Sequence, residues 1–354
     1  MSLPEGIQHK HVPAALVCCI RFHMQTRSDI QDALQELILA IPASNIAGPP
    51  FLHIQSFSSY TEGFAAEAGF LVFQPYEAPR IHTKTLPAME VLSLVHTGSL
   101  ETLRESRIKL FQFAHQKALV SDEFSREVYP GWPDPDAPVE LNFVIHNWNR
   151  LLADNLQRVL GESGRQSVLQ GRETLPIDAG LDERFAWSRQ AMLAVDSVAS
   201  EHQKFDIVSG CAHIFPVELL EKVRQVIADA RQGGLLPLEA VDAVLAFMET
   251  DPGWNEKDHS RQGNIIRQTK HPADPVAYAS AQTDEERRAA YCFCPVIRSR
   301  LDQGMPVTYC YCGSGWYRQQ WETITGKPVT VQVLRSVLKG DMVCEFATHL
   351  AQDL

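Results

Sequence analysis

Six of the eight cysteines lie in the second half of the chain, and most of them are paired. Cys292 and Cys294 form one Cys-x-Cys pair, Cys310 and Cys312 form a second, and Cys344 follows. In a strand, this spacing points both sulfurs of a pair to one face. Four thiolates can hold zinc in a tetrahedron, and iron or an iron–sulfur centre takes similar ligands. We therefore predict that the four paired cysteines converge on one site. Its role has three possible interpretations: a metal site, redox-active thiols, or inert buried cysteines.

Two further groups near these cysteines could take part in chemistry. Cys211 and His213 are separated by one residue and form a candidate ligand or base pair. Cys312 precedes a glycine-rich turn, Gly313 to Gly315, and then a predicted helix. A thiol at a helix N-terminus has its thiolate favoured by the helix dipole, which lowers its pKa. The sequence thus predicts Cys312 as the most reactive of the four paired thiols.

A carboxylate in the first half is a candidate ligand-binding group. Residues 139–143 alternate in polarity, so Glu140 and Asn142 point to the same face of the predicted strand. Glu140 lies either on a solvated sheet face or at the base of a cleft, where a cationic or hydrogen-bonding ligand would offset its desolvation. The aromatic residues that could form the walls of such a cleft are Phe57, Tyr60, Phe64, Phe70, Phe73, Tyr129 and Trp148.

The elements that would position Glu140 form a weak internal duplication. Each half reads strand, helix, strand, strand. Two such units would pair into one antiparallel sheet, with both helices on one face and a cleft on the other. The expected strands are 15–20, 51–57, 68–73, 91–96, 126–129 and 139–145, and the expected helices begin at Ser28, with Gln31 closing a capping box, and at Leu100.

The second half of the chain reads as helices followed by a small α+β end. Residues 151–180 are rich in glycine breaks and are expected to form a linker between domains 1–150 and 181–354. The whole chain is therefore expected to be of the α+β class. Expected helices are 182–204, 216–231, 237–249, 284–291 and 315–325, residues 252–280 are expected to be irregular, and 328–337 with 342–349 is expected to be a β-hairpin.

Residues 8–148 resemble the GyrI-like domain, also called the AraC-type effector-binding domain of bacteria. The resemblance lies in four segments: Leu86–Glu90, His96–Leu103, Arg126–Tyr129 and Val139–Leu141. It implies a pocket for small, often cationic or aromatic, molecules, with Glu140 projecting into it and Tyr129 lining it. Some members of this family are hydrolases, which would give Glu140 the role of water activation and Tyr129 that of leaving-group support.

The end of the chain, at about residues 290–350, resembles two other groups of proteins. Gly326 to Val329 and Gly340 to Phe346 are similar to the close of 4-vinyl-reductase-type domains and of proteins grouped with L-2-amino-thiazoline-4-carboxylate hydrolase. Ser336 stands where the vinyl-reductase pattern usually has a cysteine. The resemblance therefore implies a small α+β module and no particular activity.

Composition limits the remaining function classes. With 32 Lys and Arg residues against 43 Asp and Glu, the formal net charge is −11, which disfavours nucleic acid and anionic membrane partners. The longest apolar stretch near the start, Val12 to Ile20, is too short to span a bilayer, and we expect a cytoplasmic protein. The expected function is binding of a small organic ligand, for sensing or sequestration. The alternative is an enzyme, either a GyrI-like hydrolase or one that depends on the thiols or a metal in the second half.

Overall fold

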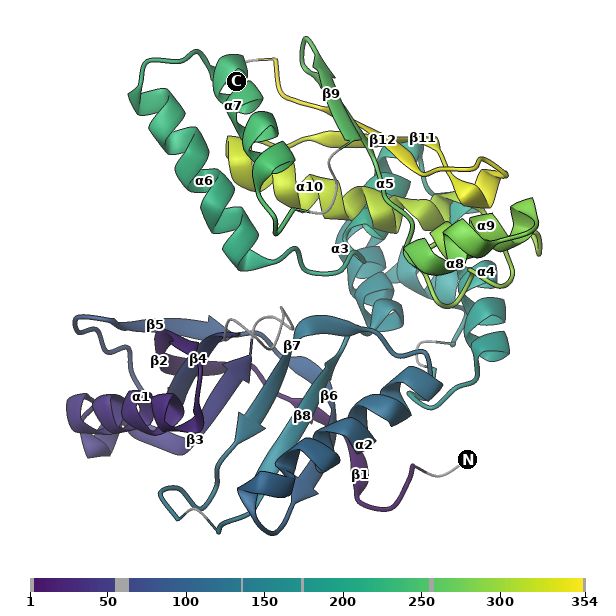
Figure 1. Cartoon of the computed structure of the whole chain (residues 1–354). Coiled ribbons are helices and arrows are strands. Elements are labelled where there is room, and N and C mark those ends of the chain that lie inside the picture. Colours follow the sequence, from purple (N-terminus) through teal and green to yellow (C-terminus); the bar gives the residue numbers. More distant parts are fainter. Residues whose placement is uncertain (1–2, 55–63, 135, 173–174, 255–257, 353–354) are drawn as a thin grey trace. The chain divides into compact units, whose positions relative to one another are not determined.

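The computed structural model describes residues 3–54, 64–134, 136–172, 175–254 and 258–352, and it omits the side chains of residues 64, 65, 122–124, 217 and 218. The chain divides into two compact units, Met1–Asn147 and Trp148–Leu354 (Figure 1). Both units combine helices with an antiparallel sheet, so the expected α+β class is confirmed. The expected linker, residues 151–180, belongs to the second unit.

The first unit is built on one eight-stranded antiparallel sheet with the order β1-β6-β8-β7-β3-β4-β2-β5. The expected duplication is present as β2-α1-β3-β4 and β6-α2-β7-β8, and the two halves meet where β3 pairs with β7. Two strands that the sequence did not indicate, β1 and β5, complete the sheet at its edges. The strands are β1 (Ile7–Val12), β2 (Ala15–Met24), β3 (Ile46–Ile54), β4 (Phe64–Val72), β5 (Ile81–Leu86), β6 (Met89–His96), β7 (Ser121–Val128) and β8 (Val139–Ile145).

Both helices of the first unit, α1 (Arg27–Ala40) and α2 (Leu103–Gln116), pack on the same face of this sheet (Figure 1). Helix α1 buries its apolar stripe against Ile20 of β2 and Leu52 of β3, and Phe111 of α2 meets Phe143 of β8 edge-on, with ring centroids 5.3 Å apart. We call this side the helix face. Side chains alternate between the two sides of a strand. Glu140 and the residues two positions away from it therefore point to the opposite side of the sheet, which we call the polar face.

Helix α1 starts differently from the expectation. The capping residue is Thr26, whose backbone N–H donates to Asp29 Oδ2 at 2.7 Å, and not Ser28 with Gln31. The helix therefore begins one residue before Ser28, and Ser28 lies inside its first turn.

In its described residues, the second unit combines eight α-helices, of which the shortest has six residues, with a four-stranded sheet of order β11-β12-β10-β9. The expected closing hairpin is confirmed as β11 paired with β12. Residues 252–280 are not irregular, because β9 and β10 form a second hairpin that turns at Gly263 with φ +57°. The elements are α3 (Trp148–Leu169), α4 (Leu181–Val198), α5 (Glu201–Ser209), α6 (Val217–Gln232), α7 (Pro237–Thr250), β9 (Asp258–Gln262), β10 (Ile265–Thr269), α8 (Pro275–Ser280), α9 (Asp284–Tyr291), α10 (Tyr311–Thr325), β11 (Thr330–Arg335) and β12 (Glu345–His349).

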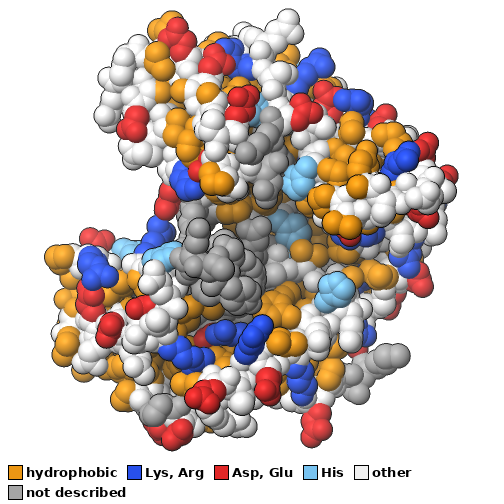
Figure 2. Space-filling view, viewed as in Figure 1, with side chains coloured by type: hydrophobic (Ala, Val, Ile, Leu, Met, Phe, Trp, Pro, Cys, Tyr) orange, Lys and Arg blue, Asp and Glu red, His pale blue; other side chains and the backbone are white. Residues whose placement is uncertain are grey.

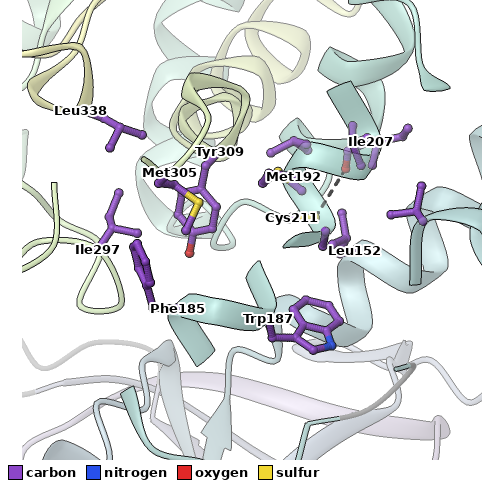
Figure 3. Close-up of a cluster of buried hydrophobic side chains, with 14 of the residues drawn as sticks. Leu152, Phe185, Trp187, Met192, Ile207, Cys211, Ile297, Met305, Tyr309 and Leu338 are labelled. Carbon is purple, nitrogen blue, oxygen red and sulfur yellow. Dashed lines mark hydrogen bonds between the residues drawn. The ribbon is translucent and has the colours of Figure 1, made fainter. Parts of the chain in front are cut away.

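Helix α3 occupies most of the expected linker and is part of the core. It is broken at Gly161, where φ is +71°, but Leu152 and Leu156 before the break are fully buried. Figure 3 shows Leu152 among the side chains of one core cluster, together with Met192, Cys211 and Tyr309. The glycine breaks in this segment are therefore a bend in a packed helix.

The surface carries both signs of charge. On the face drawn in Figure 2, acidic and basic side chains are interspersed. In the described part of the chain, no helix has the length and apolar character that crossing a membrane would require.

Candidate functional site

A row of polar side chains crosses the polar face of the first unit. Strand register pairs its members directly across seven of the eight strands, from β1 to β2. The two ends of the row are exposed, and its centre is buried. Its members, in order, are Gln8, Ser93, Asn142, Arg126, His53, Glu67 and Arg21, and we call them the polar row.

Glu140 lies next to the polar row, on the same face of β8 and two residues before Asn142. Ser93 Oγ donates to Glu140 Oε1 at 2.9 Å, and Lys10 Nζ lies 3.1 Å from the same oxygen. Burial by itself would raise the pKa of this carboxyl group, but the hydrogen bonds from Ser93, Lys10 and Asn142 outweigh it and lower the pKa. Glu140 is therefore an ionised carboxylate, half-buried and already paired.

Arg126, at the centre of the row, is 95% buried, since its exposed fraction is 5%. Its guanidinium carbon lies 4.7 Å from the ring centroid of Phe51, a cation–π distance. Burial lowers the pKa of Arg126, and the negative charge of Glu140 opposes that shift. Gly69 allows this arrangement, because a Cβ there would lie 2.6 Å from the Phe51 ring and 2.8 Å from Cys19 Sγ.

Buried atoms in the polar row lack hydrogen-bond partners among the described residues. These atoms are Asn142 Oδ1 and Arg126 Nε, and Asn142 has an exposed fraction of 3%. Such atoms carry a desolvation cost that a bonded partner would offset. Next to Arg21 in the row, Glu67 is fully buried and is paired with His82 at 2.9 Å and with Lys84. His53 lies between, and burial lowers its pKa well below the usual range, so its imidazole is neutral.

Tyr129, the second expected binding residue, lies on the helix face and not beside Glu140. Its hydroxyl donates to Glu127 Oε2 at 2.6 Å, and Glu127 is also paired with Arg107 of α2. Because Val128 is the residue opposite Glu140, Tyr129 and Glu127 point to the other side of the sheet. The sheet therefore separates Glu140 from Tyr129, and the two cannot act on one small substrate.

A small pocket of about 60 Å³ lies beside Tyr129 on the helix face. A cavity that binds benzene has roughly 150 Å³, so this pocket is too small to enclose an organic ligand as it stands. It is lined by Arg27, Ile30, Gln31, Leu34, Leu100, Tyr129, Trp132, Pro133, Asp134, Ala137, Pro138 and Val139.

Of the other aromatic residues expected to line the site, Tyr60, Phe64 and Trp148 either lie outside the described side chains of the first unit or belong to the second unit. Tyr60 lies outside the described residues, and Phe64 begins β4 but its side chain is not described. Trp148 begins helix α3 in the second unit, where its ring lies 4.9 Å from that of Tyr309. Among the described side chains, Phe51 lies on the polar face in the same row as Glu140.

The paired cysteines lie in helix ends and loops of the second unit, and not in strands as expected. Cys292 follows the last residue of α9, Cys294 lies in the loop after it, Cys310 ends a short 3₁₀ helix, and Cys312 lies in the first turn of α10. The thiols make separate contacts: Cys294 Sγ lies 3.2 Å from Tyr309 Oη, Cys310 Sγ lies 3.2 Å from Ser336 Oγ, and Cys312 Sγ donates to Cys211 O at 3.3 Å.

Burial dominates the acidity of these thiols. It raises the pKa of Cys310 and of Cys312 to about 12, and it raises those of Cys292, Cys294 and Cys344 as well. The expectation of a low pKa at Cys312 was therefore wrong: the residue does lie at a helix N-terminus, but desolvation of the thiolate outweighs the dipole.

The described residues hold no group of three or more His, Cys, Asp or Glu side chains that could bind one metal ion. Binding of zinc or iron by Cys292, Cys294, Cys310 and Cys312 stays a prediction. Of the further candidates, Cys211 is fully buried and donates to Ile207 O at 3.4 Å (Figure 3), and the backbone carbonyl of His213 accepts a hydrogen bond from Gln319.

Sequence reasoning singled out Glu140 and put Asn142 on the same face, but it missed the basic groups around them. Arg126 stands in the Arg126–Tyr129 segment and Asn142 stands two residues after Glu140. Alternation predicts their face, but only the register of β7 against β8 shows that Arg126 and Asn142 are opposite each other. Lys10 belongs to β1, a strand that the sequence did not indicate.

No family model matches the chain, and no curated protein resembles it. Among solved structures, the EcmrR–DNA complex is 20% identical, with 39% of this chain and 56% of that chain covered and a TM-score of 0.35. The EcmrR C-terminal domain is 18% identical, with 39% and 96% covered and a TM-score of 0.34. SAV2435 bound to tetraphenylphosphonium is 12% identical, with 39% and 93% covered and a TM-score of 0.29. The chain thus spans about half the length of the first of these proteins, and similarities this low assign it no function.

Proposed function

We propose that the first unit binds a small organic molecule on its polar face, beside Glu140, and that the protein senses or sequesters this molecule. The observation that carries the proposal is the buried, unpartnered carbonyl oxygen of Asn142 next to the ionised Glu140. A ligand that donates a hydrogen bond there would offset the desolvation cost that the fold now bears. The sequence resemblance to effector-binding domains, which also points to Glu140, supports the same site.

Binding is the activity that this arrangement favours over hydrolysis. The hydrolase alternative needs a carboxylate and a phenol on one substrate, and Glu140 and Tyr129 lie on opposite faces of the sheet. Glu140 is also held in its ionised form by Lys10 and Ser93, which occupy one of its oxygens.

A ligand screen on the full chain tests the proposal. Neutral, cationic and anionic aromatic compounds would be ranked by the rise in melting temperature that binding produces by mass action. Asn142→Leu, which keeps the branched shape of the side chain and removes its polar atoms, should abolish the rise, whereas Gln8→Leu at the exposed end of the polar row should not. The proposal would be contradicted if no compound in the library raised the melting temperature of the wild-type chain more than that of Asn142→Leu. Recovery of the ligand unchanged, by mass spectrometry, distinguishes binding from turnover.

A further inference from the structure

The charge of Glu140 is already balanced inside the fold. Its Oε1 receives both Lys10 Nζ at 3.1 Å and Ser93 Oγ at 2.9 Å. A cationic ligand would have to compete with Lys10 for this carboxylate, or displace it. The carboxylate alone is therefore a poor anchor for a cation in this chain.

The charge of Arg126 is less well balanced. Among the residues that the structure describes, no carboxylate accepts a hydrogen bond from its guanidinium, and its Nε has no partner. Its close contacts are the ring of Phe51 at 4.7 Å and the electrostatic attraction of Glu140. A 95% buried guanidinium with an unmet donor at Nε is costly, and a planar carboxylate is the acceptor that its fork of N–H groups fits best.

The balance of charge on this part of the polar face is positive. Among the described side chains around Arg126, the cations are Lys10 and Arg126 and the anion is Glu140. Glu67, further along the polar row, is paired with His82 and Lys84. We propose that the ligand of this site is an organic carboxylate with an apolar body, whose carboxylate binds Arg126. This inference rests on the proposed binding function and names the class of its ligand, where the sequence indicated a small organic molecule, cationic or aromatic.

The surroundings of Arg126 fit the apolar part of such a ligand. The row next to the polar row reads Val95, Glu140, Val128 and Phe51 across four strands, so apolar side chains flank Arg126 and Glu140. Val95 is 52% exposed, which is high for a valine in a strand. An aromatic ring beside the carboxylate would cover this surface, and Asn142 Oδ1 would accept from any donor that the ligand carries.

Calorimetric titration of the full chain with three matched probes tests the inference. The probes are naphthoate, naphthamide and naphthylmethylammonium, which share a ring system and differ in charge. Naphthoate should bind more tightly than the other two. Arg126→Gln should weaken naphthoate about 10- to 150-fold, the range for a lost hydrogen bond to a charged group. Glu140→Gln should leave naphthoate as tight or tighter, because it removes a like charge.

Two control variants separate the site from general effects. Arg80→Gln removes an exposed arginine that is paired with Glu36 and should change nothing. Lys10→Gln removes the second cation near the site and should weaken naphthoate. If circular dichroism shows that Arg126→Gln does not fold, the inference is tested by the effect of Lys10→Gln on naphthoate binding and by the order of affinity of the three probes.

The possible failures of the inference and of the proposed function differ. Tighter binding of the ammonium probe, lost in Asn142→Leu and in Glu140→Gln, would overturn the inference and leave the proposed function standing. Naphthoate binding that is unchanged in Arg126→Gln and Lys10→Gln would place the carboxylate elsewhere and also overturn it. If none of the three probes binds, the inference is overturned. The broader ligand screen with Asn142→Leu then tests the proposed function separately.

Discussion

At the scale of single residues, the neighbours of a group determined its chemistry more than its own type did. Glu140 is a paired carboxylate, because Lys10 and Ser93 both contact its Oε1. Cys312 was expected to be acidic, but burial makes it a poor acid. In both cases the deciding partners are distant in sequence, so no local pattern could have indicated them.

Acidification should reveal the hydrogen bonds of Glu140. Because its pKa is lowered in the folded protein, its contribution to stability is complete above the pKa of an unfolded glutamate, about 4.3, and is lost as the pH falls towards the lowered value. The wild-type first unit should therefore lose more stability than Glu140→Gln between about pH 5 and pH 3. Equal loss in urea titrations at each pH would mean that the carboxylate gains nothing from Ser93 and Lys10.

The buried thiols should be unreactive near neutral pH. With pKa values of about 12, Cys310 and Cys312 are protonated at pH 7, and the thiolate is the nucleophile. Iodoacetamide labelling followed by peptide mass spectrometry should therefore modify both much more slowly than a free thiol. Since unfolded thiols ionise near pH 8.5, the second unit should also lose stability as the pH rises above about 8.5. Rapid labelling of Cys312 in folded protein at pH 7 would contradict this account.

At the scale of elements, the duplicated half-sheets could be predicted and the edge strands could not. Strands β2, β3, β4, β6 and β8 are apolar runs, which are typical of buried strands, and the apolar residues of α1 recur at helical spacing. Strand β1 reads Ile-Gln-His-Lys-His-Val and β9 reads Asp-His-Ser-Arg-Gln, which are polar because each lies at an edge. The Cys-x-Cys spacing suits a strand, but the capping box at Thr283 fixes α9, and Cys292 falls at its end.

The close packing of β4 against Phe51 leads to a prediction at the scale of elements. Gly69→Ala would drive a methyl group to 2.6 Å from the Phe51 ring and 2.9 Å from Cys18 O, so it should destabilise the first unit by roughly 1–3 kcal/mol, the range for overpacking. Gly48→Ala in β3 is the matched control, because its Cβ would meet Leu71 at an ordinary 3.5 Å. Urea unfolding of both variants measures the difference. Equal stability of the two variants would show that Phe51 has room to move.

At the scale of the whole molecule, two units with separate cores share one chain. The candidate site belongs to the first unit, and the cysteines other than Cys18 and Cys19 belong to the second. The first unit ends at Asn147, three residues before the expected end of the first domain. The glycines that follow suggested a linker, and the structure has helix α3 there, with a break at Gly161. Glycine in a sequence signals a bend, and whether the bend is packed depends on the helices that cover it.

The net charge of −11 makes a prediction about partners for the whole chain. Duplex DNA is bound largely through Lys and Arg contacts to phosphates, and an acidic protein repels it. Electrophoretic shifts at about 0.15 M salt should therefore show no sequence-dependent binding below micromolar concentrations. A sub-micromolar, sequence-dependent shift would require a basic surface that the charge balance does not suggest.

The central claim is that the polar face of the first unit binds a small molecule at Asn142, Arg126 and Glu140. The most direct test is a crystal structure of the full chain with the ligand that gives the largest stabilisation in the screen. The account predicts ligand density on the polar face, with an acceptor of the ligand on Arg126. Density on the helix face beside Tyr129, or in the second unit with the polar face unchanged, would contradict it.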